Sequence, residues 1–120
     1  IHRILKNNGH VFIAVPNHES FDANFYKQYW AAWDVPIHLW HFTAKTIKKI
    51  FEKSNLKLIK TKGMFFDSFY VSLLSEEYKS GKKNYIKALV IGLISNIIGF
   101  ISKNGYSSHI YIFKKTKKPF

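Results

Sequence analysis

The sequence contains no cysteine, only one arginine among 19 basic residues, and only seven acidic residues. Without cysteine, the chain can form no disulfide framework and offers no thiolate nucleophile or thiolate metal ligand. Its six glycines are scattered, so it has no glycine-rich turn of the kind that lets backbone approach a nucleotide closely. The lack of cysteine is compatible with a reducing compartment, and we expect a cytoplasmic location.

Apolar residues make up 47% of the 120 residues and aromatic residues 18%, which predicts one globular domain with a single core. The formal net charge is +12, a value typical of proteins that bind nucleic acid or anionic membranes. The lysines are dispersed, however, and no known nucleic-acid-binding motif is present. We therefore expect no nucleic-acid partner, and we keep a basic nucleic-acid- or anionic-membrane-binding module as the alternative function.

Three segments are predicted to be β-strands. The first is a nearly continuous apolar run, which is typical of a strand buried on both faces, and Pro16 ends it. The predicted strands are His10–Val15, Leu56–Lys62 and Ser107–Lys114. The lysine-rich tail that begins at Lys114 is predicted to be a solvated, frayed end.

Helices are predicted between the strands, and Ile1–Lys6 resembles the end of another helix. Ser20–Trp33 has an aromatic side chain at every fourth position from Phe21, which predicts one helix with Ser20 as its N-cap. Thr43–Ser54 is the clearest helix. Thr43 is its predicted N-cap, Ile47, Ile50 and Phe51 form its inward face, and Asn55 is suited to end it with a positive φ.

The most apolar stretch is Tyr85–Ile101, and the segment before it, Met64–Ser80, has no clear period. The apolar run is shorter than the ~20 residues of a membrane span, and Ser95 and Asn96 interrupt it. We expect one or two helices that are buried against the sheet. A surface that lies on a membrane or on a partner is the alternative.

Residues 5–17 read LKNNGHVFIAVPN, and residues 34–43 read DVPIHLWHFT. The first segment resembles the LKPGG turn, hydrophobic strand and proline of class I S-adenosylmethionine-dependent methyltransferases. The second, with the helix after it and the junction at residues 54–56, is similar to the D-x-P-R-H-L-x-H-F-T segment of the small-molecule methyltransferases in that superfamily. Ile37 stands where the family has arginine, and Asn55 stands where it has the junction glycine.

The resemblance implies an α/β chain that is the C-terminal part of a Rossmann-like methyltransferase fold. Residues 1–120 would form a single acceptor-side domain, and the N-terminal cofactor-binding half would be absent. The full-length protein would use S-adenosylmethionine to methylate a small-molecule acceptor, with a lipid- or glycan-linked acceptor as an alternative. Because the glycine-rich turn is missing, the cofactor-binding residues are unknown, and we expect no cofactor and no activity for this chain alone.

In this fold, the last strand inserts antiparallel between the two strands before it. The resemblance therefore implies a three-stranded mixed sheet with flanking helices, in which Ser107–Lys114 lies between the other two strands. The first strand would keep an unpaired edge, which invites pairing with another chain. We expect a homodimer through this edge, and peripheral contact with a membrane is a further expectation for the lysines and apolar stretch after residue 81.

Site residues are expected in the loops at the carboxyl ends of the strands. His38 and His41 are the candidate catalytic residues, because histidine can act as a base near neutral pH. The candidate substrate-binding residues are Asn17, His18, Trp30, Trp33 and Trp40. Alternatively, the histidines fix the loop by hydrogen bonds to backbone and the tryptophans pack it. We expect no metal, since no cysteine or matched carboxylate set completes the His38-x-x-His41 spacing.

Overall fold

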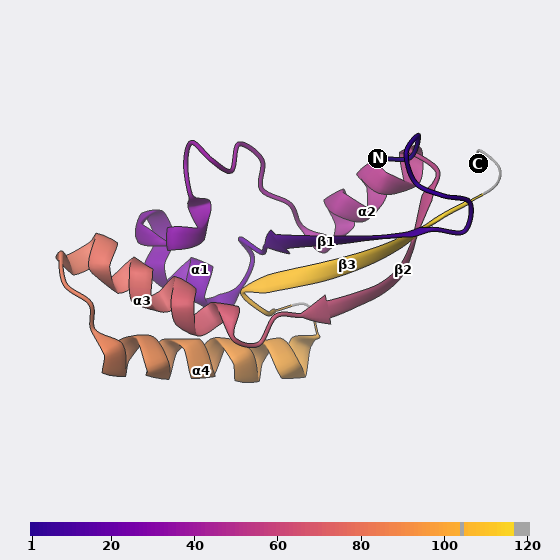
Figure 1. Ribbon diagram of the computed structural model, residues 1–120. Coiled ribbons are helices and arrows are strands. Elements are labelled where there is room, and N and C mark those ends of the chain that lie inside the picture. Colours follow the sequence, from indigo (N-terminus) through magenta and orange to yellow (C-terminus); the bar gives the residue numbers. More distant parts are fainter. Residues whose placement is uncertain (104, 117–120) are drawn as a thin grey trace.

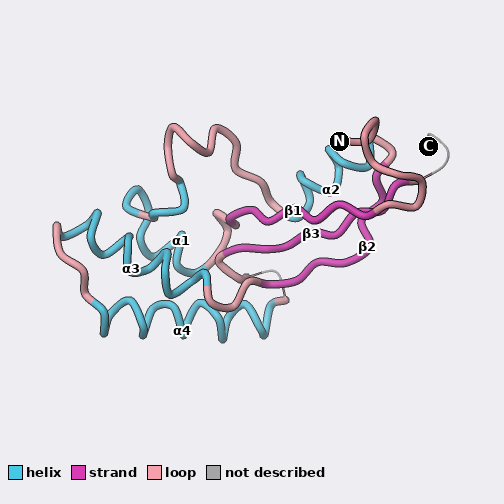
Figure 2. The backbone as a smooth tube through the Cα atoms, in the orientation of Figure 1, coloured by secondary structure: helices cyan, strands magenta, loops and turns pink. Residues whose placement is uncertain are grey.

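The computed structural model describes residues 1–103 and 105–116. Its elements are β1 (His10–Pro16), α1 (Phe21–Tyr26), 3₁₀ turns at Lys27–Tyr29 and Ala31–Trp33, α2 (Ala44–Lys53), β2 (Leu56–Gly63), α3 (Asp67–Ser80), α4 (Tyr85–Ser102) and β3 (Ser108–Lys115). The molecule is elongated, 51 × 31 × 19 Å. Helices α1, α3 and α4 gather at one end, and α2 packs beside the sheet at the other (Figures 1 and 2).

The strand order is β1-β3-β2, and β3 pairs antiparallel with both neighbours. In the centre of the sheet, Tyr111 of β3 lies opposite Ile13 on one side and Thr61 on the other. The predicted position and direction of the last strand are therefore confirmed. Both ladders are antiparallel, so the mixed sheet and the Rossmann-like architecture stay predictions.

Two clusters of buried side chains form the core. The first lies between the sheet and α2, where the ring of Phe51 stacks on Phe113 at 4.7 Å, and includes Ile47, Leu56, Tyr111 and Phe113. The second lies among α1, α3 and α4 and includes Ala23, Tyr26, Trp30, Val71 and Ile91. The two clusters correspond to the two ends of the molecule, and β1 carries the chain from one to the other.

The predicted single helix over Ser20–Trp33 is wrong. Ser20 caps α1 as predicted, with its Oγ accepting a hydrogen bond from the Ala23 backbone at 3.3 Å. The helix nevertheless ends at Tyr26, because Lys27 has a positive φ of 53°. A strict spacing of four also drifts around a helix of 3.6 residues per turn. Ala23 and Tyr26 are consequently buried, while Phe25 is partly exposed.

Both predicted ends of α2 are confirmed. Thr43 and Thr46 form a reciprocal capping box, and Asn55 has a φ of 59°. Ile47 is fully buried, as predicted, but Ile50 is half exposed, so the inward face is narrower than the sequence indicates. The first residues, 1–6, form turns and no helix.

The prediction that β1 is buried on both faces is wrong. Val11, Ile13 and Val15 pack on the core, whereas Phe12 on the opposite face is 67% exposed. One face of the strand contacts the α2 cluster, and no described element covers the other. In the tail, Lys115 belongs to β3 and donates to the Leu5 carbonyl, while Lys117 and Lys118 lie outside the described residues.

The apolar stretch forms a single helix, α4, and the expectation that it is buried is wrong for most of its large side chains. Its buried residues are small or polar, apart from Ile91: Ala88, Ile91, Gly92, Ser95, Asn96 and Gly99. By length and composition, α4 is the one described helix that could cross a membrane. Before it, the ambiguous segment forms α3, which Gly81 ends with a φ of 74°.

Candidate functional site

A small cavity lies at the carboxyl end of β1, where the loop before α2 meets α3. Its volume is about 230 Å³. It is lined by Pro16, Ala31, Ala32, Asp34, His38, Asp67, Tyr70, Val71, Leu74 and Tyr78. We call it the His38 cavity. Its walls combine apolar side chains with two carboxylates, an imidazole and two phenols, a mixture typical of a binding site for a small organic molecule.

His38 is held by its own loop. Asp34 has a left-handed backbone, with φ 43°, and its carbonyl accepts a hydrogen bond of 2.9 Å from the His38 backbone. The Asp34 carboxylate lies 3.9 Å from Nδ1 of His38, and both side chains are about two-fifths exposed. A carboxylate in this position can orient the imidazole. Both ring nitrogens of His38 are free of hydrogen bonds among the described residues, so the ring can take part in proton transfer.

A second hollow of about 290 Å³ lies beside the first and shares Pro16 and His38 with it. Trp40 lines this hollow and is 78% exposed. His41 lines it too, and its Nε2 is 2.9 Å from the Trp33 carbonyl. That contact uses one ring nitrogen of His41 to fix the loop, so His38 is the better placed of the two predicted bases.

Trp33 brings three other predicted site residues together. Its ring lies 6.1 Å from that of His18, 5.2 Å from that of Trp30 and 4.8 Å from that of His41. Its indole nitrogen donates to the Lys27 carbonyl at 2.7 Å. The structure therefore gathers these four rings into one cluster, which is the packing role that the sequence left open, and it leaves Trp40 outside.

Trp30 and Asn17 are buried and support the fold around the site. The Trp30 indole nitrogen donates to Asp22 at 2.8 Å, and the ring is almost wholly buried. The Asn17 side chain donates to the Tyr106 carbonyl at 3.0 Å and accepts from the Glu19 backbone at 3.2 Å. These contacts join the end of β1 to the segment before β3. The substrate-binding roles of both residues stay predictions.

Sequence reasoning missed Asp22, a fully buried carboxylate that accepts three hydrogen bonds. The donors are Trp30 Nε1 at 2.8 Å and the hydroxyls of Ser95 and Ser107, each at 2.7 Å. Asp22 follows the cap Ser20, and an acidic residue in a first helical turn is ordinarily solvent-exposed. Nothing in the local pattern distinguishes it from such a residue.

Sequence reasoning also missed the wall that α3 gives to the His38 cavity. Tyr70, Leu74 and Tyr78 recur every four residues and line the cavity, and Asp67 lies at the first turn and accepts a hydrogen bond from Ser108. Deeper in α3, Glu76 is buried and forms an ion pair of 3.0 Å with Lys87 of α4. Burial, together with the nearby Glu76 carboxylate, raises the pKa of Tyr26. The four-residue spacing of Tyr70, Leu74 and Tyr78 was the sequence signal that could have indicated this wall.

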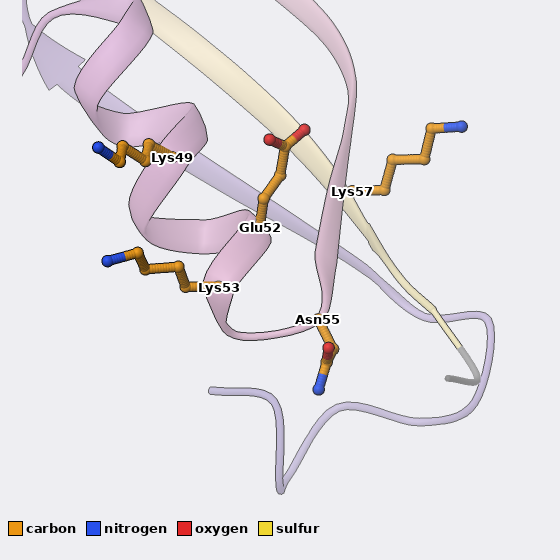
Figure 3. A pocket seen from close by; sticks show the side chains of 5 residues that line it. All are labelled: Lys49, Glu52, Lys53, Asn55 and Lys57. Atoms are coloured by element: carbon orange, nitrogen blue, oxygen red, sulfur yellow. The ribbon is translucent and has the colours of Figure 1, made fainter. Parts of the chain in front are cut away.

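A larger hollow lies elsewhere, at the turn between α2 and β2, and has a volume of about 630 Å³. It is lined by Lys49, Glu52, Lys53, Asn55 and Lys57. Figure 3 shows Lys49 and Lys53 projecting from one side of α2, while Lys57 projects from β2 in the opposite direction. Because the ammonium group of Lys57 points away from those of Lys49 and Lys53, the three lysines form no common binding point for an anion. Size alone therefore does not make this hollow the site.

The methyltransferase domain family matches residues 1–61, just over half of the chain. The chain belongs to this family. The matched segment contains β1, the His38 loop and α2, whereas α3, α4 and β3 lie outside it. No curated protein and no solved structure matches the chain. Membership supports methyl transfer as the general chemistry. The matched segment includes the loop on which the sequence placed the candidate site.

Methyltransferase domains imply S-adenosylmethionine, and the glycines of this chain do not fit that cofactor. A side chain at Gly63 or Gly99 would meet the ring of Tyr106, and one at Gly92 would meet Phe69. Gly9 and Gly105 likewise approach the chain itself, and Gly81 ends α3. At five of the six glycines, the protein's own atoms thus occupy the space that a side chain would take. In the part of the chain that the structure describes, no group of three histidine, aspartate or glutamate side chains could hold a metal.

Proposed function

We propose that this chain is the acceptor-binding part of an S-adenosylmethionine-dependent methyltransferase, and that its acceptor is a small molecule bound in the His38 cavity. One observation carries the proposal. His38, beside Asp34, lines a cavity at the carboxyl end of β1, within the segment that matches the methyltransferase family. Ligands of open α/β sheets bind at this end of the strands.

The proposed chemistry of this chain is proton removal and positioning. His38 takes the proton of an acceptor hydroxyl or amine, which makes the oxygen or nitrogen a better nucleophile. Asp34 holds the imidazole in orientation and stabilises the positive charge that develops on it. The apolar walls, including Val71 and Leu74, hold the acceptor and exclude water, so that its nucleophilic atom is presented in one direction.

The methyl donor, in this proposal, is bound by residues outside residues 1–120. The support is that this chain has no glycine-rich turn and that its own side chains occupy the approaches its glycines offer. The order β1-β3-β2 also agrees with the arrangement that the family resemblance implied for the last three strands. We therefore expect no binding of S-adenosylmethionine or its demethylated product when either is titrated into this chain in a calorimeter. Micromolar binding would contradict this assignment.

The test of the site uses the full-length protein and donor labelled in its methyl group, with a small-molecule extract as the acceptor pool. His38→Ala should lower methyl incorporation by roughly 10²- to 10⁴-fold, the usual contribution of a general base, and leave donor affinity unchanged. His10→Ala is the matched control, because His10 is exposed on β1 and lines neither the His38 cavity nor the hollow beside it. An unchanged rate for His38→Ala would exclude His38 as the base.

A further inference from the structure

Helix α4 presents its apolar side to solvent. Seven of its exposed large side chains recur at three- and four-residue intervals and cover one face of the helix: Ile86, Leu89, Val90, Leu93, Ile97, Phe100 and Ile101. Burial of one such side chain is ordinarily worth about 1.5–3 kcal/mol. A contiguous apolar surface of this size on a protein marks an interaction site.

The opposite side of α4 is small and polar, and hydrogen bonds fix it to the rest of the protein. Ser95 donates to Asp22 at 2.7 Å, and Asn96 donates to the Phe65 carbonyl at 2.8 Å. Gly92 lies against Phe69 and accepts a hydrogen bond from Ser68 at 3.1 Å. In α4, the large apolar side chains thus face solvent and the small and polar ones face the protein, the opposite of a helix that packs its apolar face on the core. These contacts also determine which face of α4 remains available.

The charged residues of α4 and of the turns at its two ends are all lysines. Residues 78–103 contain five lysines and no acidic residue. Lys82 and Lys83 lie in the turn that leads into α4, and Lys103 follows its last residue. Lys87 pairs with Glu76, and Lys83 lies 3.8 Å from the exposed Glu77. Both ends of the apolar face therefore carry positive charge, as in helices that lie on anionic lipid.

We propose that α4 docks the protein in the plane of a bilayer that contains anionic lipid. Its apolar face enters the boundary between headgroups and acyl chains, and its flanking lysines contact the lipid phosphates. Eighteen residues of helix are about 27 Å long, close to the thickness of a bilayer core. Insertion across the bilayer would remove Ser95 and Asn96 from their partners and leave polar groups in hydrocarbon, which is costly. Docking in the plane keeps every one of these contacts.

The surroundings of α4 agree with a flat docking surface. Phe66 is 81% exposed, and it follows Phe65, whose carbonyl accepts the hydrogen bond from Asn96. Aromatic side chains favour the membrane interface. In Figure 1, α4 runs along the lower margin of the molecule beneath α3, on the β2 side of the sheet. The unpaired edge of β1 lies on the other side. A further strand beside β1 would therefore leave α4 uncovered.

The first experiment is co-sedimentation of the protein with vesicles of phosphatidylcholine, with and without phosphatidylglycerol. We expect binding to the anionic vesicles that weakens as salt is added. The double variant Leu93→Ser, Ile97→Ser should lose at least about tenfold in affinity, because it removes two apolar side chains from the face. The matched control is Ile50→Ser, Ile59→Ser. Its two side chains are 48% and 51% exposed, as are Leu93 and Ile97, but they lie on α2 and β2.

The second pair of variants tests the charges. Lys82→Glu with Lys83→Glu should lower affinity for the anionic vesicles by about tenfold or more, whereas Lys49→Glu with Lys53→Glu on α2 should have a much smaller effect. Equal losses in both pairs would show attraction by net charge alone and overturn the proposal. An absence of binding to the anionic vesicles would also overturn it. A lipid-free dimer that the double variant Leu93→Ser, Ile97→Ser converts to monomer would overturn it as well, because a second copy would then cover α4. Far-UV circular dichroism checks that each variant is folded.

Discussion

The carboxylate of Asp22 accepts a hydrogen bond of 2.7 Å from the hydroxyl of Ser95, although 73 residues separate them in the sequence. The same carboxylate accepts from Ser107, immediately before β3. One buried side chain thus joins α1 to α4 and to the central strand. Through Trp30, it also supports the ring cluster beside the His38 cavity.

Asp22→Asn should destabilise the protein by about 1–3 kcal/mol, because an amide nitrogen would face a donor where an oxygen now accepts. Urea denaturation would measure the loss. Glu77→Gln is the control: Glu77 makes only an exposed ion pair with Lys83, and its replacement should change stability by less than about 0.5 kcal/mol. Equal stabilities of the two variants would contradict the joining role of Asp22.

Gly92→Ala should destabilise the protein by about 1–3 kcal/mol, although alanine is the better helix former. A Cβ at this position would lie 2.6 Å from the Phe69 ring and 3.1 Å from its Cα, so α4 would have to move away from α3. Thermal unfolding provides the measurement. Val90→Ala, on the exposed face of the same helix, should have little effect, and a stabilised Gly92→Ala protein would show that the two helices pack less closely.

Stability should fall as the pH drops below about 6.5, partly because of His109 in β3. Burial lowers the pKa of His109 below its usual value of 6.5, so the unfolded chain binds a proton that the folded chain excludes. The contribution is complete above pH 6.5 and is lost as the pH falls toward the lowered pKa. Unfolding free energies between pH 5 and 7.5 should show a positive slope with pH.

His109→Gln should flatten that slope, whereas His10→Gln, at an exposed position, should preserve it. Tyr111, two residues along β3, provides the alkaline counterpart. Burial raises the pKa of Tyr111 to about 12, so its ionisation should not unfold the protein below pH 10. A slope that survives His109→Gln unchanged would assign the acid sensitivity to other groups.

The outer edge of β1 should support self-association. Among the described residues, β1 pairs only with β3, and beyond the strand Asn17 makes one isolated parallel bridge with Phe42. An open edge with the exposed Phe12 invites pairing with a second chain. Light scattering should show mass rising with protein concentration, and Phe12→Lys should reduce it. A monomer at high concentration would exclude this dimer.

The strands and the ends of α2 could be predicted because each has a strong local signal. Thr43 and Asn55 are residue types with direct backbone consequences at helix ends, and Gly63 and Pro16 end apolar or alternating runs. The order of the strands came from the family resemblance, since nothing local specifies that the last strand lies in the centre. The motifs shared with the methyltransferase family therefore indicated the strand order, which the spacing of apolar residues could not.

The errors have a common physical origin. The burial of Asp22, the exposure of Phe12 and the outward apolar face of α4 all depend on what tertiary structure places nearby, and local pattern carries no such information. For the candidate site, residue type indicated the loop and His38, and the structure places His38 in the wall of a cavity, while its role stays a prediction. The cavity wall on α3 was not, because Tyr70 and Tyr78 belong to a segment whose period was ambiguous.

The central position of β3 determines the order of events during synthesis and folding. His10 pairs with Lys114, and Leu56 pairs with Lys115, so neither outer strand has its ladder until the last strand has emerged from the ribosome. Each ladder must close a long loop, which slows folding. In the meantime, the emerging chain exposes two unpaired strands, the kind of surface that chaperones recognise.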